Sequence, residues 1–141
     1  MAIYVYRSVA YWNETDAAGI VHFSNFFRYC ERAEEDFWLN RYGGLNEARH
    51  KFNLLFPRVR AECNFFFPIY PYDRFRVEIV DIILGNSSIT YKHKIYNESR
   101  GDYLSAECEI TVVCIDKNTF KSTSLPEEIR NFLLNNGART K

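Results

Sequence analysis

An aspartate set among small residues is the strongest candidate for chemistry in this sequence. Asp16 lies in the segment Glu14–Asn25, which joins a strand-like stretch to a helical one. Small residues around Asp16 let another backbone approach closely, and Gly19 lets the chain bend where a side chain would obstruct it. The helix that follows begins with unpaired N–H groups and the positive end of its dipole. A carboxylate there can attack a carbonyl or hold a water, while each N–H donor stabilises the oxyanion by about 3 kcal/mol.

The same segment also has ordinary structural interpretations. Aspartate commonly caps a turn or a helix, so Asp16 could serve the backbone alone. A lone histidine near a helix start, such as His22, is typical of packing or capping. The acidic residues of the helix are expected on a solvated face, although one of them could reach a site if the apolar face is broad: Glu31, Glu34, Glu35 and Asp36.

Periodicity predicts the elements that hold this segment. Residues Ile3–Trp12 alternate as a first strand, and Ser24–Arg41 place apolar residues at helical spacing. Gly43 and Gly44 close that helix. The rest of the chain is predicted to form mostly strands, at Leu54–Phe67, Phe75–Leu84, Ser88–Tyr96 and Tyr103–Ile115. A short amphipathic helix follows, and Pro126 begins it.

One strand, one long helix and about four further antiparallel strands indicate an α+β fold. We expect a curved antiparallel five-stranded sheet wrapped around the long central helix. The length of 141 residues fits one domain over residues 1–141. Within Phe75–Leu84, alternation places Asp81 on the face that carries Phe75, Val77 and Ile79.

Composition excludes several classes of protein. The 18 basic and 18 acidic residues cancel, which gives no basic surface for nucleic acid. The longest apolar runs, such as 65–67, are too short to span a membrane. The start, Met1–Arg7, lacks the layout of a signal peptide, which predicts a cytoplasmic protein. The four cysteines show no C-x-x-C pair, so we expect free buried thiols and no metal: Cys30, Cys63, Cys108 and Cys114.

A family resemblance gives the segment a more specific meaning. The run Glu14-Thr15-Asp16-Ala17-Ala18-Gly19-Ile20-Val21, then Asn25-Phe26-Phe27-Arg28-Tyr29 and Glu31-Arg32-Ala33, resembles the signature of the 4-hydroxybenzoyl-CoA thioesterase family, which includes the Tol-Pal-associated branch. Three downstream segments resemble the family's later strands and hairpin: 60–68, 72–74 and 85–88. The likeness as a whole covers about residues 3–116. The resemblance implies a hot-dog fold and an acyl-CoA thioesterase without a cofactor.

The resemblance also implies roles for particular residues. Asp16 matches the family's catalytic aspartate, which acts as nucleophile or as general base toward water, and the backbone N–H of Phe23 matches its oxyanion donor. Asn25 occupies the position of the family's asparagine, and Gly19 and Val21 are expected beside the substrate. Family sites lie between subunits, which implies a homodimer or homotetramer.

The sequence departs from the family pattern at three positions. Glu14 replaces an aspartate, His22 replaces the usual tyrosine, and Phe23 replaces the histidine of the Tol-Pal branch. Branches that act on aromatic acyl groups, such as the 1,4-dihydroxy-2-naphthoyl-CoA thioesterases, carry phenylalanine there. This favours an aromatic acyl-CoA, and it leaves a catalytic role open for His22.

Two other functions remain open. A non-catalytic acyl-CoA or acyl-carrier binding module could use the same scaffold, since fold does not determine function. A dehydratase of this fold would need a catalytic histidine with an acidic partner on the helix. His50 and His93 lie outside the loop–helix segment, which disfavours a dehydratase.

Overall fold

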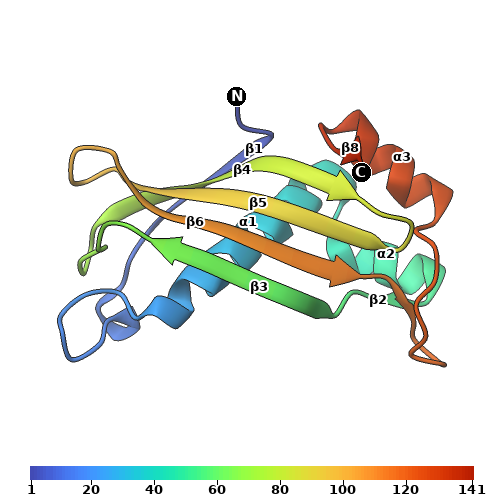
Figure 1. The fold of residues 1–141 in the computed structure, drawn as a ribbon, viewed down its shortest axis with the longest axis horizontal. Coiled ribbons are helices and arrows are strands. Elements are labelled where there is room, and N and C mark those ends of the chain that lie inside the picture. The colour runs from blue at the N-terminus through green and yellow to red at the C-terminus, as the bar shows by residue number, and fades with distance from the viewer.

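The long segment of helical periodicity forms helix α1, Phe23–Tyr42, which runs across one face of the sheet in the computed structural model of residues 1–141 (Figure 1). His22 caps its first turn, and Gly43 ends it in the left-handed conformation with φ of 98°. Glycine adopts this conformation without a steric penalty, which explains why the helix stops where it does.

The sheet has the predicted antiparallel path of five strands, in the order β1-β4-β5-β6-β3. Its strands are β1 Tyr4–Val9, β3 Arg58–Phe65, β4 Arg74–Leu84, β5 Ser88–Asn97 and β6 Tyr103–Val113. The β4–β5 hairpin turns at residues 85–87, as expected. The hot-dog prediction of a sheet wrapped around one long helix is therefore confirmed (Figure 1).

Smaller elements complete the fold, and two of them differ from the expectation. The first strand stops at Val9, and the chain then makes a 3₁₀ turn at Trp12–Glu14. A short helix α2, Leu45–Phe52, was not anticipated. The predicted amphipathic helix is α3, Glu127–Asn135. Three strands have only two residues each: β2 Leu54–Leu55, β7 Ile115–Asp116 and β8 Arg139–Thr140. Strand β8 pairs with β4 in parallel.

The core lies between α1 and the concave face of the sheet, and aromatic rings fill much of it. Tyr29 of α1 stacks on Phe75 of β4, with 4.2 Å between the ring centroids. Phe37 and Trp38 lie near the other end of α1 and contact Phe132 of α3. These residues are almost completely buried apart from Phe132, so ring packing fixes the helix against the sheet.

A β-bulge between Ile79 and Asp81 shifts the facing of β4. Beyond the bulge, Ile82 and Leu84 are buried, whereas Asp81 points outward to Arg139 at 2.9 Å. The expectation that Asp81 shares the inner face is therefore wrong. One extra residue reverses the alternation, and simple period-two counting does not detect it.

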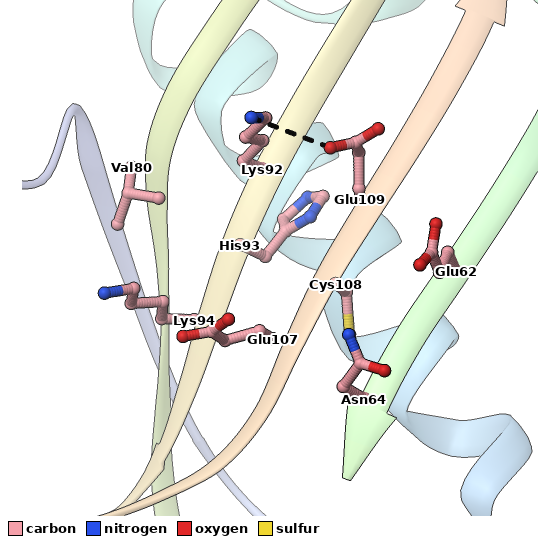
Figure 2. A pocket seen from close by; sticks show the side chains of 9 residues that line it. All are labelled: Glu62, Asn64, Val80, Lys92, His93, Lys94, Glu107, Cys108 and Glu109. Atoms are coloured by element: carbon pink, nitrogen blue, oxygen red, sulfur yellow. Dashed lines mark ion pairs between the residues drawn. The ribbon is translucent and has the colours of Figure 1, made fainter.

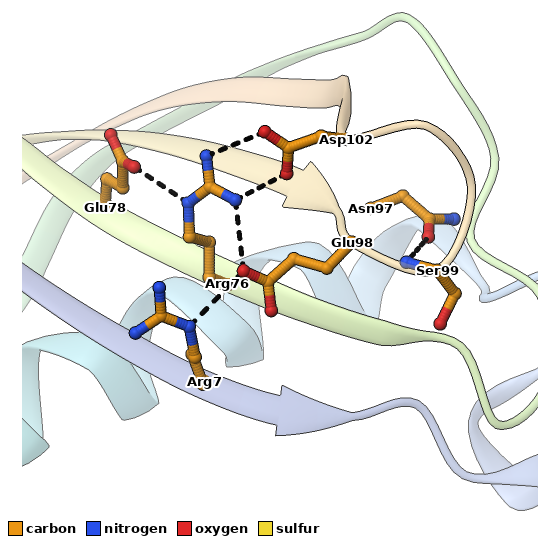
Figure 3. Close-up of polar contacts among 7 residues, drawn as sticks. All are labelled: Arg7, Arg76, Glu78, Asn97, Glu98, Ser99 and Asp102. Atoms are coloured by element: carbon orange, nitrogen blue, oxygen red, sulfur yellow. Dashed lines mark hydrogen bonds and ion pairs between the residues drawn. The ribbon is translucent and has the colours of Figure 1, made fainter.

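The outer face of the sheet is charged. At one end Arg76 bonds to Glu78 at 2.8 Å and to Glu98 at 3.1 Å, and it also reaches Asp102 (Figure 3). The side-chain bond from Asp102 raises the pKa of Arg76 above its ordinary value, with Glu78 and Glu98 adding to it, although burial opposes the shift. No helix of the structure is long and apolar enough to cross a membrane.

Two of the four cysteines form a disulfide. Cys63 of β3 and Cys108 of β6 are directly opposed, with their Cα atoms 4.1 Å apart. The expectation of four free thiols is wrong for this pair and correct for Cys30 and Cys114, which are free and buried. Opposition across the sheet depends on strand register, which the separation of 45 residues does not reveal.

Candidate active site

The segment between the 3₁₀ turn and α1 is a closed loop. Thr15 pairs with Val21, and the N–H of Asp16 donates to the carbonyl of Ile20 at 2.9 Å. At the tip, Gly19 donates its N–H to the Asp16 carbonyl at 3.0 Å and has φ of +79°. That positive φ strains any residue with a side chain, so Gly19 serves the shape of the loop.

The carboxylate of Asp16 is half-buried and forms no ion pair. Its Oδ1 atom accepts the N–H of Ala18 at 2.8 Å, the contact expected of an aspartate that stabilises its own turn. Its Oδ2 atom has no partner in the protein. The structural role of Asp16 therefore uses one oxygen, and the second is free to act on a substrate or a water.

The first turn of α1 leaves one backbone donor free. The Nδ1 atom of His22 accepts the N–H of Ser24 at 3.2 Å, which satisfies one of the orphan amides of the helix. Asn25 donates its N–H to the carbonyl of His22 at 2.9 Å. The N–H of Phe23 has no acceptor in the protein. The predicted oxyanion donor is thus available, at the positive end of the helix dipole.

Asp16 and Phe23 line the same groove. The groove measures about 370 Å³, and its walls are mostly apolar: Ile20, Val21, Phe23, Phe26, Phe65, Phe66, Phe67 and Pro68. The ring of Phe65 meets Phe26 edge to face, with centroids 5.2 Å apart, and meets Phe23 in the same way at 6.4 Å. Phe23, Phe65 and Phe66 are well exposed. Exposed rings beside a free carboxylate are typical of a ligand site, not of a core.

The other predicted site residues are placed differently. Val21 lines the groove and donates its N–H to the carbonyl of Ile69 at 2.8 Å. Gly19 and His22 do not line the groove. Gly19 shapes the loop, and His22 caps the helix. Asn25 uses its Nδ2 atom to hold the carbonyl of Glu14 at 2.8 Å. These positions support structural roles for Gly19, His22 and Asn25.

A buried carboxylate supports the wall at Pro68. Asp73 accepts hydrogen bonds at Oδ2 from Arg100 at 2.8 Å, from Asn97 at 2.9 Å and from the Tyr70 N–H at 3.0 Å. Asn97 also reaches the carbonyl of Pro68 at 3.3 Å. The network links the β5–β6 turn to the segment that forms the edge of the groove.

This network makes stability depend on pH. Burial by itself would raise the pKa of Asp73, but the bonds from Arg100, Asn97 and Tyr70 lower it below the ordinary value. A lowered folded-state pKa stabilises the fold above the unfolded value of about 4, and this contribution is lost as the pH falls through the folded value. We expect Asp73→Asn to flatten the fall in unfolding free energy below about pH 4 in urea titrations, whereas equal slopes for variant and wild type would contradict it.

A second hollow, of about 220 Å³, lies on the outer face of the sheet, and charged side chains of β3, β5 and β6 surround it (Figure 2). Lys92 lies 3.7 Å from Glu109, and Glu109 also pairs with Arg60. Glu107 and Lys94 also line this hollow and form no ion pair, but no helix begins there, so it lacks the backbone N–H donor that the loop offers beside its carboxylate.

Glu34 was expected on a solvated helix face, and this is wrong. Its side chain is 4% exposed and bonds to Arg58 of β3 at 2.9 Å. Its other oxygen lies 2.8 Å from Nε2 of His93 on β5, in a contact without good hydrogen-bond angles. His93 thus has an acidic partner on the helix, but the His93 side chain is completely buried and outside the groove.

Comparison with known proteins places the chain in a family. The model of the thioesterase-like superfamily matches residues 10–133. A 1,4-dihydroxy-2-naphthoyl-CoA hydrolase of Crocosphaera subtropica is 27% identical over 93% of this chain and 96% of the relative. The enzyme of the same name from Microcystis aeruginosa is 28% identical over 91% of each chain.

Solved structures agree on the fold. A 1,4-dihydroxy-2-naphthoyl-CoA thioesterase from Synechocystis superposes with a TM-score of 0.84 at 24% identity, over 93% of this chain and 95% of the other. A gentisyl-coenzyme A thioesterase superposes with a TM-score of 0.76 at 25% identity, over 91% of this chain and 98% of the other.

Proposed function

This chain belongs to the thioesterase-like superfamily and is an acyl-CoA thioesterase, and we propose that it hydrolyses an aromatic acyl-CoA in the groove beside Asp16. The observation that carries this proposal is the placement of a free carboxylate oxygen and a free backbone N–H on one groove lined by phenylalanines. Within the superfamily, we assign the chain to the 4-hydroxybenzoyl-CoA thioesterase family.

The reaction needs only groups that the groove supplies. The thioester carbonyl oxygen accepts the N–H of Phe23, which stabilises the charge that develops on that oxygen. Asp16 then either removes a proton from the water that attacks the carbonyl carbon, or attacks that carbon itself to form a mixed anhydride, which water cleaves to release the acid and restore Asp16. The C–S bond breaks and CoA leaves as a thiolate, so a strong general acid is unnecessary. His22 is not required, because its Nδ1 atom already caps the helix.

The groove supports an aromatic acyl group as the substrate. Phe65 lines the groove and meets Phe23 and Phe26 edge to face, and an aromatic acyl group can pair with such rings in edge-to-face or offset geometry. Two curated relatives are named for the hydrolysis of 1,4-dihydroxy-2-naphthoyl-CoA, whose acyl part is aromatic. Both observations favour a planar ring over a long flexible chain.

Substrate preference can be measured by release of free thiol from acetyl-, palmitoyl-, benzoyl- and 1,4-dihydroxy-2-naphthoyl-CoA. We expect kcat/KM to be highest for the aromatic thioesters, and Phe65→Ala to lower it about tenfold for these and much less for acetyl-CoA, because the lost ring contacts only the larger group. Phe120→Ala removes another exposed ring, 69% exposed against 47% for Phe65, from a turn outside the groove and is the control. A preference for palmitoyl-CoA, unchanged by Phe65→Ala, would contradict the aromatic assignment.

The two other functions fit the structure less well. A module that only binds acyl-CoA has no use for a carboxylate beside an unpaired helix N–H. A dehydratase would need its histidine and acid within reach of a ligand, whereas His93 and Glu34 are sealed between helix and sheet. Thiol release in the same assay distinguishes hydrolysis from binding.

We also propose that the chain forms a homodimer or homotetramer. Strand β3 is the edge of the sheet, pairs only with β6, and has most of its side chains exposed. Its end carries Phe65, so a second copy that pairs along this edge would also cover the mouth of the groove. Pairing of this edge with its own copy gives a dimer, and a tetramer would use a second interface.

A cytoplasmic location is part of the same proposal. Cys30 and Cys114 are free thiols, which suits a reducing compartment. The Cys63–Cys108 bond would be open to reduction there, and β3 would remain paired to β6 by its backbone hydrogen bonds.

A further inference from the structure

Glu14 has more contacts with the active loop and helix than any role in a turn requires. Its Oε1 atom accepts the N–H of Tyr11 at 2.8 Å and the hydroxyl of Tyr29 at 2.9 Å. Its backbone carbonyl accepts the N–H of His22 at 2.9 Å and Nδ2 of Asn25 at 2.8 Å. One residue before the loop therefore contacts three residues on the first two turns of α1 and its cap.

Tyr29, which donates its hydroxyl to Glu14, is held firmly by its surroundings. Tyr29 is completely buried and stacks on Phe75 of the central sheet. Burial, and next the hydrogen bond to Glu14, raise the pKa of Tyr29, so its hydroxyl remains a donor throughout any practical assay range. The side chain of Glu14 is itself only 11% exposed. The loop is thus connected to the sheet through Glu14 and the fully buried ring of Tyr29.

The geometry points to Glu14 as a positioning residue for the proposed reaction, on which this inference rests. We propose that the clamp formed by Glu14 with Tyr29 and Asn25 sets the position of the Asp16 carboxylate relative to the N–H of Phe23. Asp16 lies two residues beyond Glu14. Phe23 lies between His22 and Asn25, which both donate to the backbone carbonyl of Glu14. Loosening the clamp separates the two groups without removing either.

Hydrolysis is sensitive to such a change. Reacting atoms must approach to about 3 Å, and a displacement of about 1 Å can cost about 100-fold in rate. Glu14 does not line the groove, so substrate binding should change little. The expected signature is a loss in kcat with a nearly unchanged KM.

Three variants test the clamp. Glu14→Ala removes the side-chain bonds to Tyr11 and Tyr29 and the ion pair between Oε2 and Arg32 at 3.7 Å, and we expect kcat to fall about 100-fold. Glu14→Gln keeps an oxygen that accepts both donors and loses the negative charge, and with it the ion pair to the half-exposed Arg32, so we expect kcat within about threefold of wild type. Tyr29→Phe removes a single hydroxyl and should lower kcat about tenfold. KM should stay within about twofold in all three.

A matched control exists on the same helix. The Tyr4 hydroxyl donates to Asp36 at 2.7 Å, the same pair of groups in the half of α1 that lies away from the loop. Tyr4→Phe should keep the kcat of wild type. Circular dichroism and thermal melts of each variant give the folded fraction by which kcat is corrected.

Three outcomes would overturn the inference. Wild-type kcat in Tyr29→Phe and in folded Glu14→Ala would show that the clamp does not position the site. A Glu14→Gln variant as slow as Glu14→Ala would show that the charge, which also pairs with Arg32, carries the effect, and would overturn a clamp made of hydrogen bonds. An equal loss in Tyr4→Phe would show a general effect of stability. If wild type itself released no thiol, the proposed function would fail before the clamp was tested.

Discussion

Replacement of Asp16 by asparagine should reduce kcat/KM for the best aromatic acyl-CoA by about 1,000-fold or more. Asparagine keeps the oxygen that accepts the N–H of Ala18 at 2.8 Å, so the turn should survive. It has no negative charge, so it can neither attack a carbonyl carbon nor take a proton from water. The measurement is steady-state thiol release, with the melting temperature as the check on folding.

A second aspartate provides the matched control. Asp116 accepts the N–H groups of Asn118 at 2.9 Å and Thr119 at 3.0 Å in a turn far from the groove. Asp116→Asn should therefore retain wild-type activity, with any loss confined to stability. Full activity of Asp16→Asn would reject the assignment of Asp16. A melting temperature lowered far more in Asp16→Asn than in Asp116→Asn would mean that the carboxylate serves mainly the fold.

Replacement of Glu34 by alanine should lower the free energy of unfolding by about 3–5 kcal/mol, the largest effect on stability that we expect. The change leaves Arg58 and His93 without the carboxylate that lies 2.9 and 2.8 Å from them. The surroundings are poorly solvated, since burial raises the pKa of the Cys30 thiol well above its ordinary value, with Glu34 adding to the shift. Arg58 would keep its exposed contact with Glu31, but the buried groups that faced Glu34 would lose their partner, which is costly there.

Urea unfolding of Glu34→Ala and Glu31→Ala separates the buried contact from the exposed one. Both carboxylates bond to Arg58, but the side chain of Glu31 is about half exposed and 3.3 Å away. Solvent screening limits such a pair to about 1 kcal/mol or less. Equal losses in the two variants would show that the buried carboxylate has no special weight.

Local signals were sufficient for most of the fold. Helical spacing located α1, and Gly43 marked its end because a left-handed backbone favours glycine. Alternation located β4, β5 and β6, since strands with one buried face repeat every two residues. Small residues around Asp16 followed by a helix start indicated the loop that bears the free carboxylate.

Contacts between distant segments could not be predicted in this way. In the sequence Glu34 lies among acidic residues that were expected on a solvated face. Its side chain is nevertheless buried, where it contacts Arg58 and His93. The bulge after Ile79 turned Asp81 outward, and register alone brought Cys63 opposite Cys108. Each of these depends on which residue of one strand or helix meets which residue of another.

The sequence by itself determined the elements, their order and the loop that offers a carboxylate ahead of a helix start, because spacing and turn residues act over a few neighbours. Tertiary structure alone decided that Phe65 comes to Asp16 and that Tyr29 holds Glu14, since sheet pairing and helix packing bring together residues far apart in the chain. Their proximity follows from burial of a shared core, a property of the whole chain and not of any short segment.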